Sequence, residues 1–146
     1  MAAEKNVENN IRRHFEKLPN AVLYKNFANT YTVAGRPDLS GIYKSVPIAI
    51  EVKRGKGGNF KPNQLDHLTK WAQAGGISIL TCLPSVNEIL TDQAKFEKQI
   101  VTIADVYQLE TEDKIDFAHK VWKKYCPLMM MIDPTYRENF VERLFK

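Results

Sequence analysis

Cysteine and long hydrophobic runs are both scarce in this sequence. The 146 residues include 2 cysteines, Cys82 and Cys126, which stand far apart, match no metal-binding spacing and give no disulfide framework. The longest apolar runs, such as LMMMI at 128–132, are too short to cross a bilayer, and MAAEKNVENNIRR lacks the apolar stretch of a secretory signal. We therefore expect a cytoplasmic protein with reduced thiols and no membrane partner.

No large excess of charge of either sign is present. Lys and Arg total 21 against 17 Asp and Glu, which gives a formal net charge of +4. This mild excess allows a polyanionic partner but does not require one. With 44% hydrophobic and 26% charged residues, a chain of this length predicts one globular domain with a hydrophobic core of ordinary size.

The periodicity of apolar residues predicts alternating helices and strands. Helices are expected at 4–18, 63–74, 85–98, 113–125 and 134–145. Strands are expected at 21–27, 30–35, 39–43, 48–53 and 77–83, and in the first half of 99–109. No internal repeat or low-complexity linker divides the chain. This order predicts an α/β fold with a mixed sheet between helices, in a single domain over 1–146.

The predicted strand IAIEVK, at 48–53, carries two charged residues in an apolar setting. Side chains of a strand alternate between its faces, so Glu51 and Lys53 share one face while Ile50 and Val52 share the other. Burying such charges costs several kcal/mol unless other interactions offset it. An isolated pair of this kind is most simply a structural ion pair at the solvent end of a strand.

Asp38, just after Pro37, adds a second carboxylate to this pair. The segment LSGIY, the turn KSVP and the strand IAIE can fold back as a hairpin that brings Asp38 beside Glu51. Two close carboxylates raise each other's pKa unless a divalent cation lies between them. Because oxygen ligands without His or Cys favour a hard cation, we expect Mg²⁺, with Mn²⁺ as a substitute.

The stretches GRPDLSGIY, IAIEVKRGKGG, KPNQLDHL and AGGISIL, in this order and spacing, resemble the VRR-NUC branch of the PD-(D/E)xK nuclease superfamily. The resemblance covers about 4–82 and leaves 83–146 as a C-terminal helical extension without a match. It implies a restriction-endonuclease-like α/β/α core that hydrolyses DNA phosphodiester bonds. It also implies that Asp38, Glu51 and the backbone carbonyl of Val52 bind the metal.

The resemblance also implies catalytic roles for three more residues. Lys53 would orient or activate the attacking water and offset charge on the phosphate. Gln64 matches the family's glutamine at the start of the next helix and would contact the water or the DNA backbone. Glu8 matches the acidic position of the first helix and would complete the site through a metal-bound water. Gln64 has a simpler alternative as a first-turn helix residue, and Glu8 as part of a solvated helix face where Glu4 is also available.

A basic loop follows the charged strand. RGKGGNFKPNQ contains three glycines and no acidic residue. Glycines let a backbone come close to phosphates, and such contacts set affinity and salt dependence rather than sequence preference. The expected DNA-binding residues are Arg36, Arg54, Lys56 and Lys61.

Free-standing, viral-type members of the family are similar to Holliday-junction resolvases that act as two-fold dimers. This implies a Mg²⁺-dependent, homodimeric endodeoxyribonuclease that cuts branched DNA in a bacterial or phage-infected host cell. Two alternatives stay open: a flap or duplex nuclease or nickase of phage recombination or defence, and a catalytically silent nucleic-acid-binding module. The apolar run LMMMI and the stripe Phe140, Val141, Leu144 and Phe145 could form the dimer surface or ordinary core.

Overall fold

A computed structural model of the chain describes residues 2–26, 37–53, 62–81, 90–95, 100–102, 128–132 and 141–145. Its labelled elements are α1 (Ala2–Glu16), β1 (Ala21–Lys25), β2 (Leu39–Tyr43), β3 (Val46–Val52), α2 (Pro62–Gln73), β4 (Ile77–Thr81), β5 (Ile100–Thr102) and β6 (Leu128–Ile132). The six strands form one sheet in the order β1-β2-β3-β4-β6-β5. None of the described helices is both long and apolar enough to cross a membrane.

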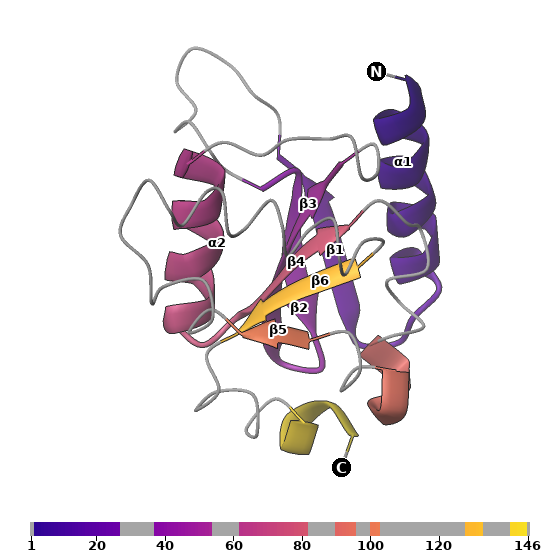
Figure 1. Cartoon of the computed structure of the whole chain (residues 1–146). Coiled ribbons are helices and arrows are strands. Elements are labelled where there is room, and N and C mark those ends of the chain that lie inside the picture. Colours follow the sequence, from indigo (N-terminus) through magenta and orange to yellow (C-terminus); the bar gives the residue numbers. More distant parts are fainter. Residues whose placement is uncertain are drawn as a thin grey trace.

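The sheet is mixed and lies between the two helices (Figure 1). β3 pairs antiparallel with β2 but parallel with β4, and α2 makes the crossover between the two parallel strands. Every residue of β4 is buried, as expected for a central strand covered on both faces. The predicted α/β class, with a mixed sheet flanked by helices, is confirmed.

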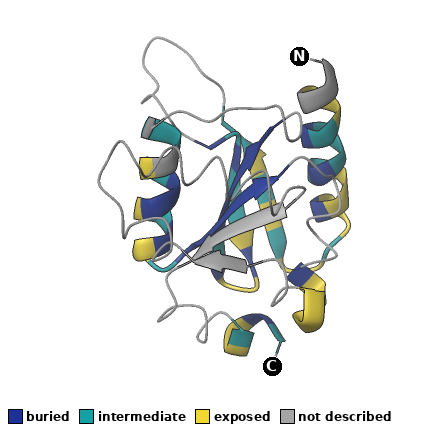
Figure 2. Ribbon diagram, in the orientation of Figure 1, coloured by how far each residue is buried: buried dark blue, intermediate teal, exposed yellow. Residues whose placement is uncertain are grey.

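α1 covers one face of the sheet with the apolar residues of its amphipathic pattern. Ile11 and Phe15 are fully buried, and they pack in one cluster with Ile48 and Ile50 of β3. Figure 2 shows this burial concentrated in the middle of the sheet and on the inner side of α1. The spacing that predicts a helix over 4–18 therefore also identifies its buried face.

α2 covers the opposite face. Ser78 of β4 donates its hydroxyl to the Leu68 carbonyl of α2, and Ser78 is the register partner of Ala49. Ala49 and Glu51 therefore point toward α2. The helix ends where the two glycines predict, because Gly75 adopts a φ of 102° and its N–H bonds to the Ala72 carbonyl at 3.0 Å.

The β2–β3 hairpin closes through Lys44 and Ser45, which have φ values of 50° and 67°. Two left-handed residues in a row give a turn whose twist matches that of the flanking strands. Tyr43 pairs with Val46 directly across this turn, so β3 begins earlier than the predicted start at residue 48.

The sequence predicts that LMMMI connects two helices, but the structure makes it strand β6, paired with β4 on one side and β5 on the other. The sheet therefore extends beyond residue 82 into the segment expected to be a helical extension. Of the C-terminal stripe, Leu144 is buried in the core cluster, and Val141 and Phe145 pack against it. The predicted strand 30–35 and helix 113–125 lie outside the described residues, as does Phe140.

We expect Gly41→Ala to weaken the pairing of β1 with β2. A Cβ at Gly41 would lie 1.7 Å from the Val22 carbonyl oxygen of β1, so the strands would have to separate. The free energy of unfolding, measured by urea titration, should fall by about 3 kcal/mol. Gly75→Ala is the control: its Cβ meets nothing within 4 Å, and only the positive φ costs about 1 kcal/mol. Equal losses in both variants would contradict this role of Gly41.

Candidate active site

Asp38 and Glu51 come together at the open end of the β2–β3 hairpin. The register pairs Leu39 with Ile50, which makes Asp38 and Glu51 the next residues across the two strands. The Asp38 Oδ2 accepts a hydrogen bond of 2.8 Å from the Val52 backbone N–H. The expected hairpin is thus present, and it places both carboxyl groups at one strand end.

Lys53 follows the strand and lies against Glu51. Its Nζ is 3.5 Å from Glu51 Oε1, and the two residues are only 7% and 3% exposed. The backbone N–H of Lys53 bonds to the Thr81 carbonyl of β4 at 2.8 Å, which continues the pairing of β3 with β4 past the last residue of the strand. The pair is therefore buried, and the simple explanation of an ion pair at the solvent end of a strand does not hold.

Gln64 joins the two charged groups from the α2 side. Its Nε2 donates to Glu51 Oε1 at 3.1 Å, and its Oε1 accepts from Lys53 Nζ at 3.0 Å. One carboxamide thus bonds to the acid and to the lysine at once. The structure brings Gln64 to the predicted site, and its contacts go beyond those of a first-turn helix residue.

Burial raises the pKa of both carboxyl groups. The pKa of Glu51 rises to about 8, because its charged form is desolvated and because it faces the negative charge of Asp38. Burial also raises the pKa of Asp38, and Glu8 adds to this effect while the Val52 N–H opposes it. A site that disfavours two negative charges in this way suits a bound cation.

Glu8 reaches the site from the other face of the sheet. It is 7% exposed, so it does not belong to a solvated helix face, and its charge acts on Asp38. Its Oε2 is 3.2 Å from the Nζ of Lys25, the last residue of β1. Sequence reasoning missed Lys25. The only sequence feature that indicates its position is the alternation of side chains in β1. This alternation puts Lys25 on the same face as Ala21 and Leu23, toward α1.

Asn26 is a second residue that sequence reasoning missed. Its Nδ2 donates to the Pro37 carbonyl at 2.9 Å and to Ser40 Oγ at 3.0 Å. Its backbone N–H bonds to the Asp38 carbonyl at 2.8 Å. Asn26 therefore holds the backbone on both sides of the Asp38 side chain, although nothing in the sequence distinguishes it from the other residues of the predicted strand 21–27.

The residues present fit a small hard cation. Glu51 Oε2 is buried and has no hydrogen-bond partner, so one oxygen is free to bind a metal. Within the described part of the chain, no group of three or more His, Cys, Asp or Glu side chains is arranged to hold an ion. Mg²⁺ suits such a site, because it usually binds through one or two carboxylates and keeps several waters.

The four predicted phosphate contacts, Arg36, Arg54, Lys56 and Lys61, lie outside the described residues. No protein-family model matches the chain, and no curated protein is similar enough to count as a relative. The geometry of Asp38, Glu51, Lys53 and Gln64 is thus the basis on which a function can be assigned.

The raised pKa of Glu51 predicts a pH-dependent stability in the absence of metal. The folded state holds a proton on Glu51 up to about pH 8, whereas the unfolded chain releases it near 4.5. The stability that Glu51 contributes through this proton is fully present below pH 4.5. It is lost as the pH rises from 4.5 through 8. The free energy of unfolding in EDTA should therefore fall by up to about 1.4 kcal/mol per pH unit between pH 5 and 8.

The matched variant for this measurement is Glu51→Gln, which keeps the shape and cannot titrate. Its free energy of unfolding should change less with pH over the same range. Added Mg²⁺ at pH 8 should raise the melting temperature of the wild type and not of the variant. Identical pH slopes in both proteins would rule out Glu51 as the titrating group.

Lys25→Met should leave the Glu8 carboxylate buried without its cation. Because Lys25 is partly exposed and water can approach, we expect a loss of about 1–2 kcal/mol in the free energy of unfolding. In a double-mutant cycle, adding Glu8→Gln should recover much of that loss. Additive effects of the two substitutions would mean that the pair does not interact in solution.

Proposed function

We propose that this chain is a Mg²⁺-dependent DNA endonuclease of the PD-(D/E)xK superfamily, with the restriction-endonuclease-like core of the VRR-NUC branch. The observation that carries the proposal is the convergence of Asp38, Glu51 and Lys53 at one strand end. The two acidic residues come from paired strands, and the lysine is 3.5 Å from one of them. A buried cluster of this composition is expensive for the fold, which favours a chemical role.

The order of the elements supports the same proposal. A first helix, a β2–β3 hairpin and a parallel β4 reached through α2 follow one another along the chain. The hairpin supplies both carboxylates, and the crossover helix supplies Gln64. The resemblance of residues 4–82 to the VRR-NUC branch implies the same sequence of elements.

The carboxylates of Asp38 and Glu51, with the carbonyl of Val52, would hold the metal. A bound Mg²⁺ would lower the pKa of a water and stabilise charge on the phosphate. The Asp38 carboxylate is already fixed by the Val52 N–H, so it needs little rearrangement to act as a ligand. Glu8 is near enough to Asp38 to raise its pKa, and it would accept a hydrogen bond from a water of the metal.

Lys53 would supply the positive charge that no carboxylate can. Its ammonium group has three donors, of which Glu51 and Gln64 take two in this arrangement. The third can be directed to the attacking water or to a phosphate oxygen, where it offsets developing negative charge. Gln64 fixes the ammonium position through its Oε1, so it acts as a positioning residue for Lys53.

Retention of the whole cluster argues against a catalytically silent module. A scaffold that only binds nucleic acid has no use for two adjacent carboxyl groups, one of which raises the pKa of the other. Replacing such a cluster with apolar residues often leaves stability unchanged or higher. The presence of both acids and the lysine therefore favours hydrolysis.

We further propose branched DNA as the substrate, with a Holliday junction cut by a homodimer. This part rests on the resemblance to free-standing VRR-NUC proteins. Two strands of one junction require two active sites, which a two-fold dimer presents. Leu144 and Val141 pack on the chain's own core, so a dimer would use other surfaces.

The test is cleavage of labelled four-way junction, flap, linear duplex and single-stranded DNA in Mg²⁺, Mn²⁺ or EDTA. Asp38→Asn and Lys53→Met should each lower the rate by about 10²–10³-fold, because each removes a group that stabilises the transition state. Lys70→Gln is the matched control, because it removes a positive charge from an exposed position on α2. Its rate should equal that of the wild type.

Paired, symmetric nicks in the junction alone would support a resolvase. Cutting of flaps or plain duplex would support the nuclease and reject junction specificity. Cutting that persists in EDTA, or in both Asp38→Asn and Lys53→Met, would reject the proposed site.

A further inference from the structure

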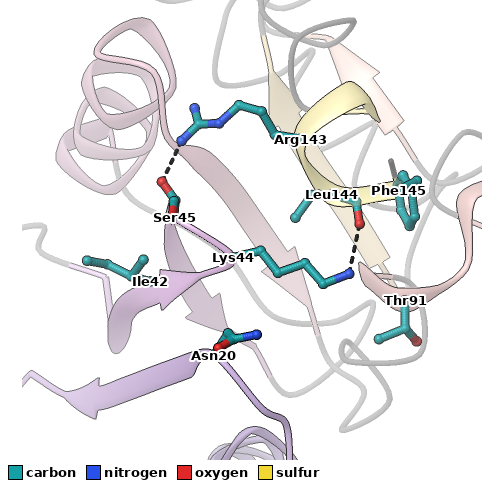
Figure 3. A pocket seen from close by; sticks show the side chains of 8 residues that line it. All are labelled: Asn20, Ile42, Lys44, Ser45, Thr91, Arg143, Leu144 and Phe145. Atoms are coloured by element: carbon teal, nitrogen blue, oxygen red, sulfur yellow. Dashed lines mark hydrogen bonds between the residues drawn. The ribbon is translucent and has the colours of Figure 1, made fainter.

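The β2–β3 hairpin is held at both of its ends. At the closed end, Lys44 Nζ donates to the Leu144 carbonyl at 2.9 Å and Arg143 donates to the Ser45 carbonyl, so the C-terminal segment fastens the turn (Figure 3). At the open end, β2 begins one residue after Asp38, so this carboxylate is carried by backbone just outside the strand. Its orientation therefore depends on interactions other than the regular pairing of β2.

Asn26, the residue after β1, holds the backbone on both sides of Asp38. Its Nδ2 donates to the Pro37 carbonyl at 2.9 Å, and its backbone N–H donates to the Asp38 carbonyl at 2.8 Å. The first bond fixes the peptide unit that precedes the Asp38 Cα, and the second fixes the peptide unit that follows it. Because each peptide unit is planar, fixing both of them also fixes the direction of the Cα–Cβ bond of Asp38.

The side chain of Asn26 suits this task because it carries two N–H donors. One goes to the Pro37 carbonyl, and the same nitrogen also donates to Ser40 Oγ of β2 at 3.0 Å. Pro37 has no backbone N–H, so its carbonyl is the only backbone group through which a hydrogen bond can hold it. An ionised aspartate or an aliphatic residue at position 26 would offer that carbonyl no donor, and a serine would have one donor for two acceptors.

The carboxylate of Asp38 is held separately, from the other side. The Val52 N–H of β3 donates to its Oδ2 at 2.8 Å. Asp38 is thus fixed through its backbone from β1 and through its carboxylate from β3, the two strands on either side of β2. A carboxylate held at both places is preorganised as a ligand, because little conformational freedom remains to be lost when an ion binds.

We propose that Asn26 is a positioning residue that orients the Asp38 carboxylate and thereby sets the metal affinity of the site. The metal is taken from the proposed function, on which this part of the inference rests. The orientation of Asp38 is a property of the chain itself and can be measured without metal or DNA. Residues that orient a metal ligand through hydrogen bonds typically change metal affinity or activity by about 10–100-fold when they are replaced.

The first measurement is hydrogen exchange of the Val52 amide, followed by NMR on the isotope-labelled full chain in EDTA. This amide reports the position of the Asp38 carboxylate, because that carboxylate is the acceptor of its hydrogen bond. Asn26→Ala removes both side-chain donors, and Asn26→Leu removes them while keeping a similar volume. We expect the Val52 amide to exchange at least about tenfold faster in both variants. Unfolding curves would verify that both variants are folded.

The second measurement is direct binding of Mn²⁺, followed by electron paramagnetic resonance. Both Asn26 variants should bind Mn²⁺ about 10–100-fold more weakly than the wild type. Ser40→Ala is the matched control, because it removes the other acceptor of the same Nδ2 and leaves the bond to the Pro37 carbonyl in place. Its Val52 exchange and its Mn²⁺ affinity should stay close to those of the wild type.

Wild-type exchange at Val52 in both Asn26 variants would overturn the proposal. Equal acceleration in Ser40→Ala would also overturn it, because the effect would then come from a general loosening of the strand end. Faster exchange with unchanged Mn²⁺ affinity would reject the link between Asn26 and the metal. Failure of the wild type to bind Mn²⁺ would instead reject the proposed function, and the exchange rate of Val52 would still decide whether Asn26 orients Asp38.

Discussion

Leu39 pairs with Ile50 in the β2–β3 hairpin, and the positions of Asp38, Glu51 and Lys53 relative to one another depend on that register. A slip of one residue in β3 would move Glu51 onto the α1 face and Ile50 onto the α2 face. Glu51 would then lose Gln64, and the carboxyl groups would lie on opposite faces. The strained turn at Lys44 and Ser45 fixes the register from one end, and the Asp38 to Val52 hydrogen bond fixes it from the other.

The charged groups of the site form a row across the end of the sheet, with a lysine at each end and three acids between them. Lys25 and Glu8 meet on the α1 side, and Glu51, Lys53 and Gln64 meet on the α2 side. Asp38 stands between them, and its pKa responds to both Glu8 and Lys53. Stability alone would favour apolar residues here, so the fold gives up free energy to keep this arrangement.

Local patterns predicted the parts of the site that lie within one hairpin. Alternation in IAIEVK put Glu51 and Lys53 on one face, and the turn at KSVP brought Asp38 to them. The burial of Glu8 and its pairing with Lys25 were not predictable, because they depend on how α1 packs on β1, 17 residues away along the chain. LMMMI was missed as a strand because a short, continuous apolar run has no alternation, and its partner β4 is distant in sequence.

The hydrogen bonds that join Lys44 to Leu144 and Arg143 to Ser45 span 100 and 98 residues. Gln64 and Glu51, by contrast, are 13 residues apart. At a synthesis rate of about 5–20 residues per second, Leu144 is added roughly 5–20 s after Lys44. In a nascent chain the hairpin, α2 and β4 that carry Asp38, Glu51 and Gln64 are therefore complete seconds before the C-terminal segment that fastens the hairpin turn. A chain that ended shortly after β4 would have these side chains but would lack the two hydrogen bonds that hold the turn at Lys44 and Ser45.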